Sequence, residues 1–543
     1  MKRVILFALF ILMFQNKSHA KNVSVGICAP PTAQATLDVN NVRAKLYNGG
    51  DMWWSNTSNT GYEIPKGSGL GSLSGGALWI SGTDNGSNLY TAGQTYRQRG
   101  FDFWPGPLGN SGTVDSSTCK YWDRMFSITG EEISRAKKSG IRSQTVLDWP
   151  GGVAPFYDAN SDGIYSPLGG DYPAYDPTET SNIPAQMIWW VMNDVGNTHT
   201  AYPGGLPMGL EIQVTAFAYK TNQSEVVNNS TMYRYKIMNK AMNTIYDFKV
   251  GFFVDGDIGG ADDDYVGCDL SIGNFNKRRD LYYTYNADAT DGSTGYGNRP
   301  PSIGLTILKT MKTAQFAAIY PSSYMFFTNQ GTPGINSDPS NAFELARYMK
   351  GLWSDGTILS YGTATGRGGA DQAYFAFPGN TDPLGRPNWT ESDVPGDRRT
   401  VTTIGGNYDL LPGATQEIET AIVWARDPVG DNLASLALLK LSTDTLREKH
   451  ANIFQPYWTG ISEEKMIARI FPNPVSDKCW IEIPSKNNEI IEVKLFDMSG
   501  KLVFQREYDP AKKIELDTNF LQKGAYIIHI NQGGRSSSQK ILK

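Results

Sequence analysis

The 543-residue chain is poor in the side chains that most enzyme sites need. It has four histidines and four cysteines, and only 19% of its residues are charged. Between residues 21 and 460 the histidines are His199 and His450. Serine hydrolases with a histidine base and histidine-ligated metalloenzymes are therefore disfavoured. The chain also has no Gly-x-Ser-x-Gly elbow, His-Glu-x-x-His pair or glycine-rich phosphate loop.

Long apolar runs are also missing. The N-terminal run, residues 4–14, follows Lys2 and Arg3 and precedes Ser18 and Ala20, which form a small-residue cleavage pattern. Because eleven apolar residues are too few to span a bilayer, residues 1–20 are predicted to be a signal peptide rather than an anchor. We expect an exported chain with no transmembrane segment after cleavage.

Positive charge is scarce in the body of the chain. The whole chain has a net charge of −5, but from Lys465 onward there are 13 basic and 9 acidic residues. The residues between the signal peptide and this tail are therefore strongly acidic. An acidic surface repels phosphate backbones, so nucleic acid is excluded as a partner.

The four cysteines, Cys28, Cys119, Cys268 and Cys479, are too dispersed for a zinc site. Export leads to an oxidising compartment, where disulfides form. Three pairings of four cysteines are open, and the sequence does not choose among them. Since Cys479 lies in the tail, a bridge among the other three is favoured. A Cys28–Cys119 bridge would pin the amino terminus.

Two-residue alternation dominates the body. Residues 210–219, 231–237 and 246–254 alternate and are joined by short polar loops, which predicts an antiparallel meander with one face on a core. Helical patterning is confined to residues 131–139 and to a longer segment from Asp431 to about Ile453. The sequence predicts a mainly β protein, with a multi-domain, β-sandwich-like body that has few helices.

Charge, composition and pattern suggest five segments. Residues 1–20 are the signal peptide, 21–180 a β-rich region, 181–460 a β-sandwich-like body with one late helix, 461–469 a linker and 470–543 a small C-terminal β-sandwich. Most of the many tryptophans are expected to fill the core, although exposed aromatic rings can also bind sugars.

One loop has the spacing of a calcium site. Asp158, Asn160 and Asp162 place oxygen-bearing side chains at alternate positions before a glycine, with Ile164 and Asp171 completing the predicted ligand set. Position twelve of an EF-hand loop carries a glutamate, whereas this loop has Gly169 there. The loop is therefore not an EF-hand. An Asx-turn loop without an ion is the alternative.

A second acidic cluster follows the predicted meander. It contains five carboxylates within ten residues: Asp255, Asp257, Asp262, Asp263 and Asp264. Close pairs of such charges repel by about 1 kcal/mol even in water. A bound cation would relieve this repulsion, and a solvated hairpin would dilute it. Calcium with a structural role is the cofactor that both acidic loops predict.

The tail has a distinct set of motifs. A turn of Pro472, Asn473 and Pro474 opens it, and short alternating segments follow. Asp497, Gly500 and Lys501 suggest a tight hairpin turn. The remaining motif positions are Leu521, Gly524, Tyr526 and a basic final segment that contains Lys540.

In their order and spacing, these motifs resemble the type A C-terminal sorting domain of the type IX secretion system of Bacteroidota. The resemblance covers about residues 470–543. It implies export by the signal peptide, recognition of the tail by the outer-membrane translocon, and removal of the tail by a sortase. It further implies that the body is released or attached to surface lipopolysaccharide, so that the protein is secreted or held at the outer cell surface.

The body more weakly resembles large uncharacterised surface proteins of the same bacteria, through residues 101–107, 158–165 with 170–173, 255–269 and 396–399. That group has no established activity, so the likeness implies no mechanism. Asp397 with Arg398 and Arg399 resembles a catalytic cluster, but a buried ion pair is favoured.

These features predict a calcium-stabilised surface protein that acts in binding, adhesion or surface structure and has a glycan or protein ligand. The alternative is a secreted carbohydrate-active hydrolase that uses two carboxylates, because aspartate and glutamate are plentiful. Whether the chain is an enzyme is left open, with a non-enzymatic role favoured.

Overall fold

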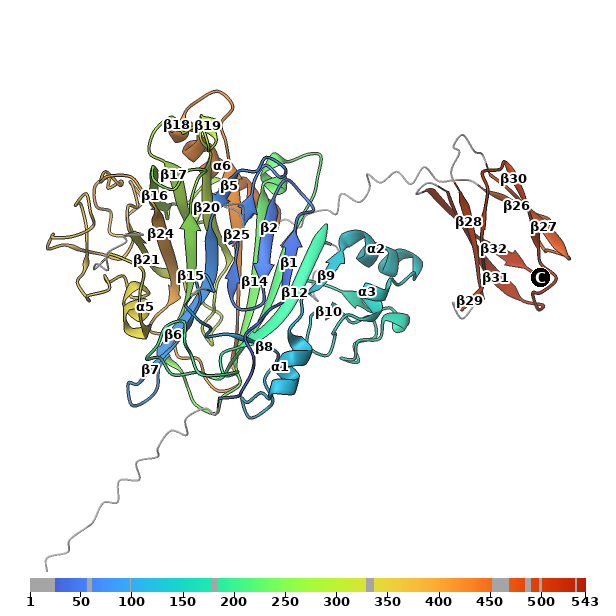
Figure 1. The fold of residues 1–543 in the computed structure, drawn as a ribbon, viewed down its shortest axis with the longest axis horizontal. Coiled ribbons are helices and arrows are strands. Elements are labelled where there is room, and N and C mark those ends of the chain that lie inside the picture. The colour runs from blue at the N-terminus through green and yellow to red at the C-terminus, as the bar shows by residue number, and fades with distance from the viewer. Residues whose placement is uncertain are drawn as a thin grey trace, which may run out of the picture. The chain divides into compact units, whose positions relative to one another are not determined.

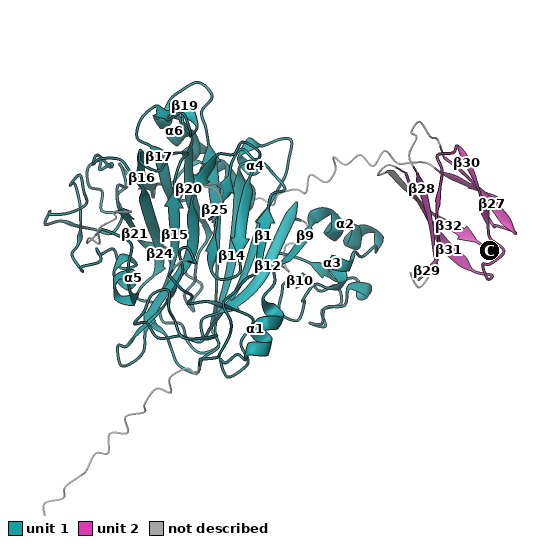
Figure 2. Ribbon diagram, in the orientation of Figure 1, with its two compact units in different colours: residues 1–456 teal, residues 457–543 magenta. Residues whose placement is uncertain are grey.

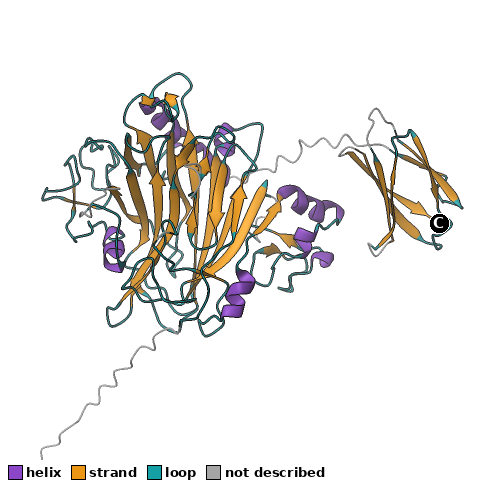
Figure 3. Ribbon diagram, in the orientation of Figure 1, coloured by secondary structure: helices purple, strands orange, loops and turns teal. Residues whose placement is uncertain are grey.

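A computed structural model describes residues 25–55, 61–97, 99–176, 183–328, 336–451, 468–483, 490–497, 501–532 and 535–543. The predicted signal peptide, most of the predicted linker and Gly500 lie outside these residues. The chain divides into two compact units, residues 1–456 and 457–543, which Figure 2 colours separately. Strands dominate both, as Figure 3 shows, so the mainly β prediction is confirmed.

The first unit contains two large antiparallel sheets. The first has ten strands within the described residues, and its main path runs β21-β24-β15-β6-β3-β2-β4-β5, with β1 on β2 and β7 on β6. Its strands are β1 (Gln34–Leu37), β2 (Arg43–Tyr47), β3 (Asp51–Met52), β4 (Tyr62–Glu63), β5 (Gly71–Leu73), β6 (Gly75–Thr83), β7 (Leu89–Gly93), β15 (Tyr246–Gly256), β21 (Pro321–Thr328) and β24 (Arg398–Gly405).

The second sheet has nine strands within the same described ranges. Its main path runs β16-β17-β20-β25-β14-β13-β12-β8, with β9 on β12. Its strands are β8 (Trp104–Pro105), β9 (Phe126–Thr129), β12 (Gln186–Asn193), β13 (Leu210–Ala218), β14 (Ser230–Asn239), β16 (Asp264–Asp269), β17 (Leu281–Asn286), β20 (Ser302–Lys309) and β25 (Thr415–Ala425). Three two-stranded ribbons complete the unit: β10 (Phe156–Tyr157) with β11 (Tyr172–Pro173), β18 (Thr290–Asp291) with β19 (Gly297–Asn298), and β22 (Leu359–Ser360) with β23 (Gln372–Ala373).

The two large sheets pack face to face around one core. Leu78 and Phe252 from the ten-stranded sheet and Trp190 and Tyr235 from the nine-stranded sheet belong to the same buried cluster. Because side chains alternate along a strand, the residues between them face the other way. Trp189 accordingly belongs to a second cluster, on the outer face of the nine-stranded sheet. That sheet is thus buried on both faces over much of its area.

Helices cover parts of this outer face. The helices are α1 (Ser116–Trp122), α2 (Gly130–Ser139), α3 (Gln144–Leu147), α4 (Glu225–Asn228), α5 (Ala342–Tyr348) and α6 (Asn432–Ala451), with short 3₁₀ turns at Pro167–Gly169 and Asn274–Asn276. α6 packs on β17, β20 and β25, whereas α2 and α3 pack against β9 (Figure 1). Among the described helices, none combines the length and apolarity needed to cross a membrane.

The two predicted helices are present. α2 spans Gly130–Ser139 and begins with a capping box between Thr129 and Glu132. α6 begins after Asp431, whose carboxylate accepts a hydrogen bond of 3.0 Å from the backbone N–H of Ala434. Such a bond satisfies one of the free N–H groups of a helix start. The expected end of α6, Ile453, lies outside the described residues.

The predicted meander is wrong in its third strand. β13 pairs with β14 as expected, but β15 lies in the other sheet, between β6 and β24. The connection after Asn239 crosses from one sheet to the other, and β25 takes the free edge of β14. The prediction that only one face of these strands lies on a core is also wrong, because both faces of β13 are buried.

Strand pairing also joins the two regions expected on either side of residue 180. β6 from the first region pairs with β15 from the second, and β9 pairs with β12. Residues up to 456 therefore form one compact unit, and no boundary separates them at residue 180. Alternating polarity predicts a strand but does not identify its partner, so pairing between distant segments was not visible in the sequence.

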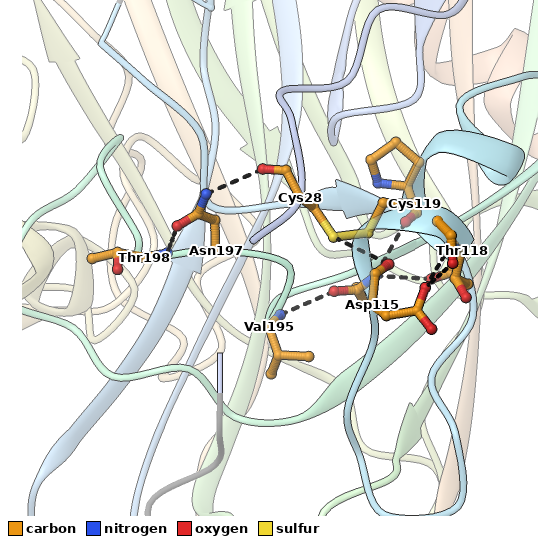
Figure 4. Close-up of a disulfide and its surroundings, with 11 residues drawn as sticks. Cys28, Asp115, Thr118, Cys119, Val195, Asn197 and Thr198 are labelled. Carbon is orange, nitrogen blue, oxygen red and sulfur yellow. Dashed lines mark hydrogen bonds between the residues drawn. A yellow bond between two sulfur atoms is a disulfide. The ribbon is translucent and has the colours of Figure 1, made fainter. Parts of the chain in front are cut away.

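A disulfide ties down the start of the described chain. Cys28 and Cys119, the latter in α1, are bonded with a Cα–Cα separation of 5.8 Å (Figure 4). Backbone hydrogen bonds from Gly26 to Val195 and from Cys28 to Gly196 hold the same segment. Cys268 and Cys479 are buried free thiols.

The second unit is a small β-sandwich. β26 (Arg469–Phe471), β27 (Lys478–Glu482) and β30 (Lys513–Asp517) form one sheet, and β28 (Ile491–Asp497), β29 (Leu502–Tyr508), β31 (Ala525–Gln532) and β32 (Arg535–Leu542) form the other. Its own core includes Ile481, Val493, Ile528 and Ile541. The predicted tail sandwich is confirmed.

Candidate metal centre

One group of carboxylates is assembled by strand pairing in the ten-stranded sheet. β15 and β24 are antiparallel, with Asp255 opposite Arg399 and Gly256 opposite Arg398. Continuing this register by one residue places Asp257 opposite Asp397. Residues about 140 positions apart in the sequence therefore meet at one end of two adjacent strands.

The three carboxylates are close enough to share one ion. Asp255, Asp257 and Asp397 each offer an oxygen, and these atoms lie within 4.8 Å of one another. Among the described residues, no other group of three or more Asp, Glu, His or Cys side chains meets this distance criterion. Asp255 is 2% exposed, and the other two are half-buried.

Arg399 and Tyr96 surround Asp255. The Nε atom of Arg399 lies 3.5 Å from Oδ1 of Asp255, and its Nη2 atom lies 3.4 Å from Oδ2 of Asp397. Arg399 also pairs with Asp338 at 2.5 Å. The Tyr96 hydroxyl donates a hydrogen bond to Oδ2 of Asp255. One cation thus lies beside several carboxylates.

Two of the carboxyl groups resist ionisation. Burial raises the pKa of Asp255 well above its usual value, the negative charge of Asp257 adds to this, and Arg399 opposes it. Burial, followed by the charge of Asp397, raises the pKa of Asp257 to about 6. Full ionisation of these carboxyl groups would therefore place more negative charge here than Arg399 offsets.

The site fits a divalent cation. Asp255 and Asp257 each keep one carboxylate oxygen, Oδ1, without a hydrogen-bond partner among the described residues. Buried carboxylate oxygens without partners are energetically costly unless a cation or donor meets them. When ionised, Asp255, Asp257 and Asp397 place three negative charges beside Arg399, which also pairs with Asp338, and a divalent ion would offset this excess.

The other members of the predicted second cluster border this group without joining it. Asp264 is fully buried, and its Oδ2 atom accepts a hydrogen bond of 2.9 Å from the backbone N–H of Ile258. Asp262 is exposed and Asp263 is half-buried. The structure therefore groups two of the five predicted residues, Asp255 and Asp257, and adds Asp397, which the sequence suggested only for an ion pair.

The first predicted calcium loop is organised by its own hydrogen bonds. The Asp158 carboxylate accepts bonds from the backbone N–H groups of Ser161, Asp162 and Gly163, and these bonds lower its pKa. The Asn160 amide donates to Asp162 at 2.8 Å. Asp171 accepts from the N–H groups of Ala159 and Ser166, and Ile164 is exposed. Ion binding by this loop stays a prediction.

The predicted sorting residues are distributed over the small sandwich. Pro472, Asn473 and Pro474 form the turn after β26. The Asn473 amide donates to the carbonyl of Lys540 at 2.9 Å, and its oxygen accepts from the N–H of Leu542 at 2.9 Å. The opening turn is thereby joined to the final strand.

The other sorting residues mark strand ends. The Asp497 carboxylate accepts a bond of 3.0 Å from the N–H of Lys501. Gly524 pairs with Lys543 through two backbone hydrogen bonds. The hydroxyl of the buried Tyr526 donates to the carbonyl of Gln522.

Comparison with known families identifies this unit. Residues 469–543 match the family described as the secretion system C-terminal sorting domain. The tail is therefore a type IX sorting domain that interacts with the secretion machinery, and the protein is delivered to the cell surface or the extracellular space. The match covers about a seventh of the chain and leaves the body unassigned.

No curated protein matches the chain. Among solved structures, one similar chain is a polysaccharide lyase, at 10% identity and a TM-score of 0.15, covering 61% of this chain and 34% of the lyase. Another is the BSP domain of a biofilm associated protein, at 9% identity and a TM-score of 0.14, covering 97% of this chain and 84% of that domain. The chain thus spans about a third of the length of the lyase, and scores this low carry no argument about the body.

Proposed function

We propose that this exported protein serves at the cell surface as a binding or structural component whose body is stabilised by calcium. The observation that supports this is the group formed by Asp255, Asp257 and Asp397 beside Arg399. Acidic side chains held this close in a buried place destabilise the fold unless a cation joins them. An extracellular protein meets calcium concentrations at which even weak sites are filled.

The ligand chemistry favours calcium over softer metals. All three side chains offer carboxylate oxygens, which suit hard cations, whereas zinc and copper sites favour histidine and cysteine. Calcium takes six to eight oxygens in flexible arrangements, so backbone carbonyls and water would complete the shell. The role is structural in this proposal, because the ion would join the ends of β15 and β24.

Thermal unfolding of the purified protein tests the proposal. A site that binds calcium only in the folded state adds about 2.7 kcal/mol when free calcium exceeds the Kd 100-fold. We expect calcium to raise the Tm by a few degrees relative to EGTA. Asp257→Asn should abolish this increment, whereas the control Asp38→Asn, at an exposed aspartate outside both acidic loops, should retain it.

A Tm that is the same in calcium and in EGTA would contradict the calcium role of both acidic loops. A calcium increment that survives Asp257→Asn would place the ion elsewhere. The loop of Asp158 is then the remaining candidate, and Asp158→Asn with Asp162→Asn would identify it.

A hydrolase with paired carboxylates is the second candidate, and one observation favours it. Asp257 has a pKa of about 6, which suits a general acid near neutral pH, and two further carboxylates lie beside it. Screening of the protein for glycan hydrolysis separates the two candidates. Hydrolysis that is lost in Asp257→Asn would favour the enzyme.

The tail also implies a fate for the body. We include in the proposal that a sortase removes residues 470–543 and that the body is released or attached to surface lipopolysaccharide. Mass spectrometry of the secreted protein tests the cleavage, since the expected mature chain lacks the tail. Gel electrophoresis tests the attachment, since an attached body migrates with lipopolysaccharide.

A further inference from the structure

A polar area interrupts the outer face of the nine-stranded sheet. On β13, β14 and β25, Gln213, Arg234, Lys236 and Glu417 point to this face, because their neighbours Val214, Tyr235 and Ile418 belong to the core between the sheets. Strands β14 and β25 are labelled in Figure 1. Charged side chains in the middle of a largely covered sheet face are unusual for a purely structural surface.

A cavity of about 280 Å³ lies over this area. The sheet supplies its polar floor, and the segment from Gly151 to Tyr175 supplies apolar walls that include Phe156. Trp189 also lines the cavity, and its indole Nε1–H is buried and has no hydrogen-bond partner among the described residues. The volume is near the lower end for ligand pockets, about 300–1,000 Å³, so it suits one small ring rather than a large ligand.

The positive charges of the cavity differ in their partners. Arg234 is fixed by Asp176 at 2.5 Å and by Glu417 at 3.0 Å. Lys309 also pairs with Glu417, at 2.6 Å. Lys236 is half-buried and lines the same cavity, yet no carboxylate of the described residues lies within 4.0 Å of its ammonium group. A ligand with a negative charge would supply that missing partner.

We infer that this cavity binds a single acidic sugar unit, such as the uronic acid or sialic acid end of a glycan, with Lys236 contacting its carboxylate. The inference rests on the proposed binding function and names its ligand class. Phe156 offers an apolar surface for the face of the sugar ring, and Gln213 and the Trp189 N–H offer hydrogen bonds to its hydroxyls. The acidic body disfavours long polyanions, so the ligand carries its charge at one unit.

Calorimetric titration of the calcium-saturated protein tests this inference. The probes are short oligosaccharides that end in glucuronate, galacturonate or sialic acid, each compared with its methyl ester, which lacks the charge. We expect at least one acid to bind at least tenfold more tightly than its ester. Its affinity should fall as sodium chloride is added, whereas that of the ester should not.

Two variants and a control locate the binding. Lys236→Met should remove the preference for the acid and leave the affinity for the ester unchanged. Phe156→Ala should weaken both probes, and the control Lys277→Met, at a half-buried lysine outside the cavity, should behave as the wild type. The Tm of each variant establishes that it is folded.

Absence of binding by all the acids, or a preference for the acid that survives Lys236→Met, would overturn the inference. The calcium proposal fails separately, because its measure is the Tm without any sugar. If calcium raises the Tm but no acidic sugar binds, the proposed function stands and the assignment of a sugar to this cavity is wrong.

Discussion

At the scale of single residues, a carboxylate's surroundings decide whether it supports the fold or strains it. Asp255 is buried beside other acids, whereas Asp123 is surrounded by donors. Asp123 accepts hydrogen bonds from the backbone N–H groups of Thr32 and Ala33, at 2.9 and 3.0 Å, and from the side chains of Thr32 and Asn48, at 2.6 and 2.9 Å. Burial alone would raise its pKa, but these bonds outweigh burial and lower it.

This lowered pKa makes the contribution of Asp123 dependent on pH. A carboxyl whose pKa is lower in the folded state stabilises the protein above its ordinary pKa and loses this effect as pH falls through the folded value. We expect Asp123→Asn to reduce the free energy of unfolding by about 1 kcal/mol at pH 7, a figure that allows for solvent screening. The difference should shrink toward pH 3 in urea titrations.

The exposed Asp38→Asn is the matched control and should leave the unfolding free energy unchanged at both pH values in EGTA. An Asp123→Asn deficit that is equal at pH 7 and pH 3 would show that the aspartate charge is not what the donors stabilise.

The candidate metal centre shows what residue patterns can and cannot predict. Asp255 and Asp257 were predicted as ligands because carboxylates gather in that short segment. Asp397 was not, because it reaches them only through the pairing of β15 with β24. Asp262 and Asp263 were included because of their proximity in sequence, but they border the group of three carboxylates without joining it.

At the scale of elements, the individual strands and helices were more predictable than their partners. The alternating segments at 210–219 and 231–237 became β13 and β14, and Asp431 marked the start of α6. The sheet that each strand joins was not predictable, as the case of β15 shows. The cavity beside Lys236 was missed for the same reason, since its lining comes from four strands of the sheet and a distant segment, residues 151–175.

Helix α6 supplies a test of the packing on the outer face of the nine-stranded sheet. Leu439 is fully buried in the outer cluster, while Leu441 in the same helix is 50% exposed. We expect Leu439→Ala to lower the free energy of unfolding by about 2–5 kcal/mol, because it leaves a cavity under the helix. Leu441→Ala should cost less than about 0.5 kcal/mol.

Chemical denaturation of both variants measures the difference. Equal effects of the two substitutions would contradict the orientation of α6, since a helix turned about its axis would bury Leu441 instead.

At the scale of the whole molecule, the tail is the part whose role follows from both sequence and comparison. The order of its motifs predicted a sorting domain, and the family match at residues 469–543 confirms it. The body gave no comparable signal, because its motifs match no characterised group.

Removal of residues 469–543 should leave the body folded and misdirected. We expect the truncated chain to accumulate in the periplasm, since the translocon recognises the tail, while the full chain reaches the surface or the medium. Immunoblots of cell fractions measure this, and a full chain with Leu441→Ala is the control that should be exported normally. Export of the truncated chain would show that another segment directs it.

The disulfide between Cys28 and Cys119 constrains how the chain can cross the outer membrane. It closes a loop over a sequence separation of 91 residues near the start of the exported chain. Disulfides form in the oxidising space between the two membranes, before the outer one is crossed. A polypeptide closed in this way cannot be threaded as one extended strand, so the outer-membrane pore must be wide enough for at least a doubled chain. The disulfide of the exported protein thus sets a lower limit on the width of the pore.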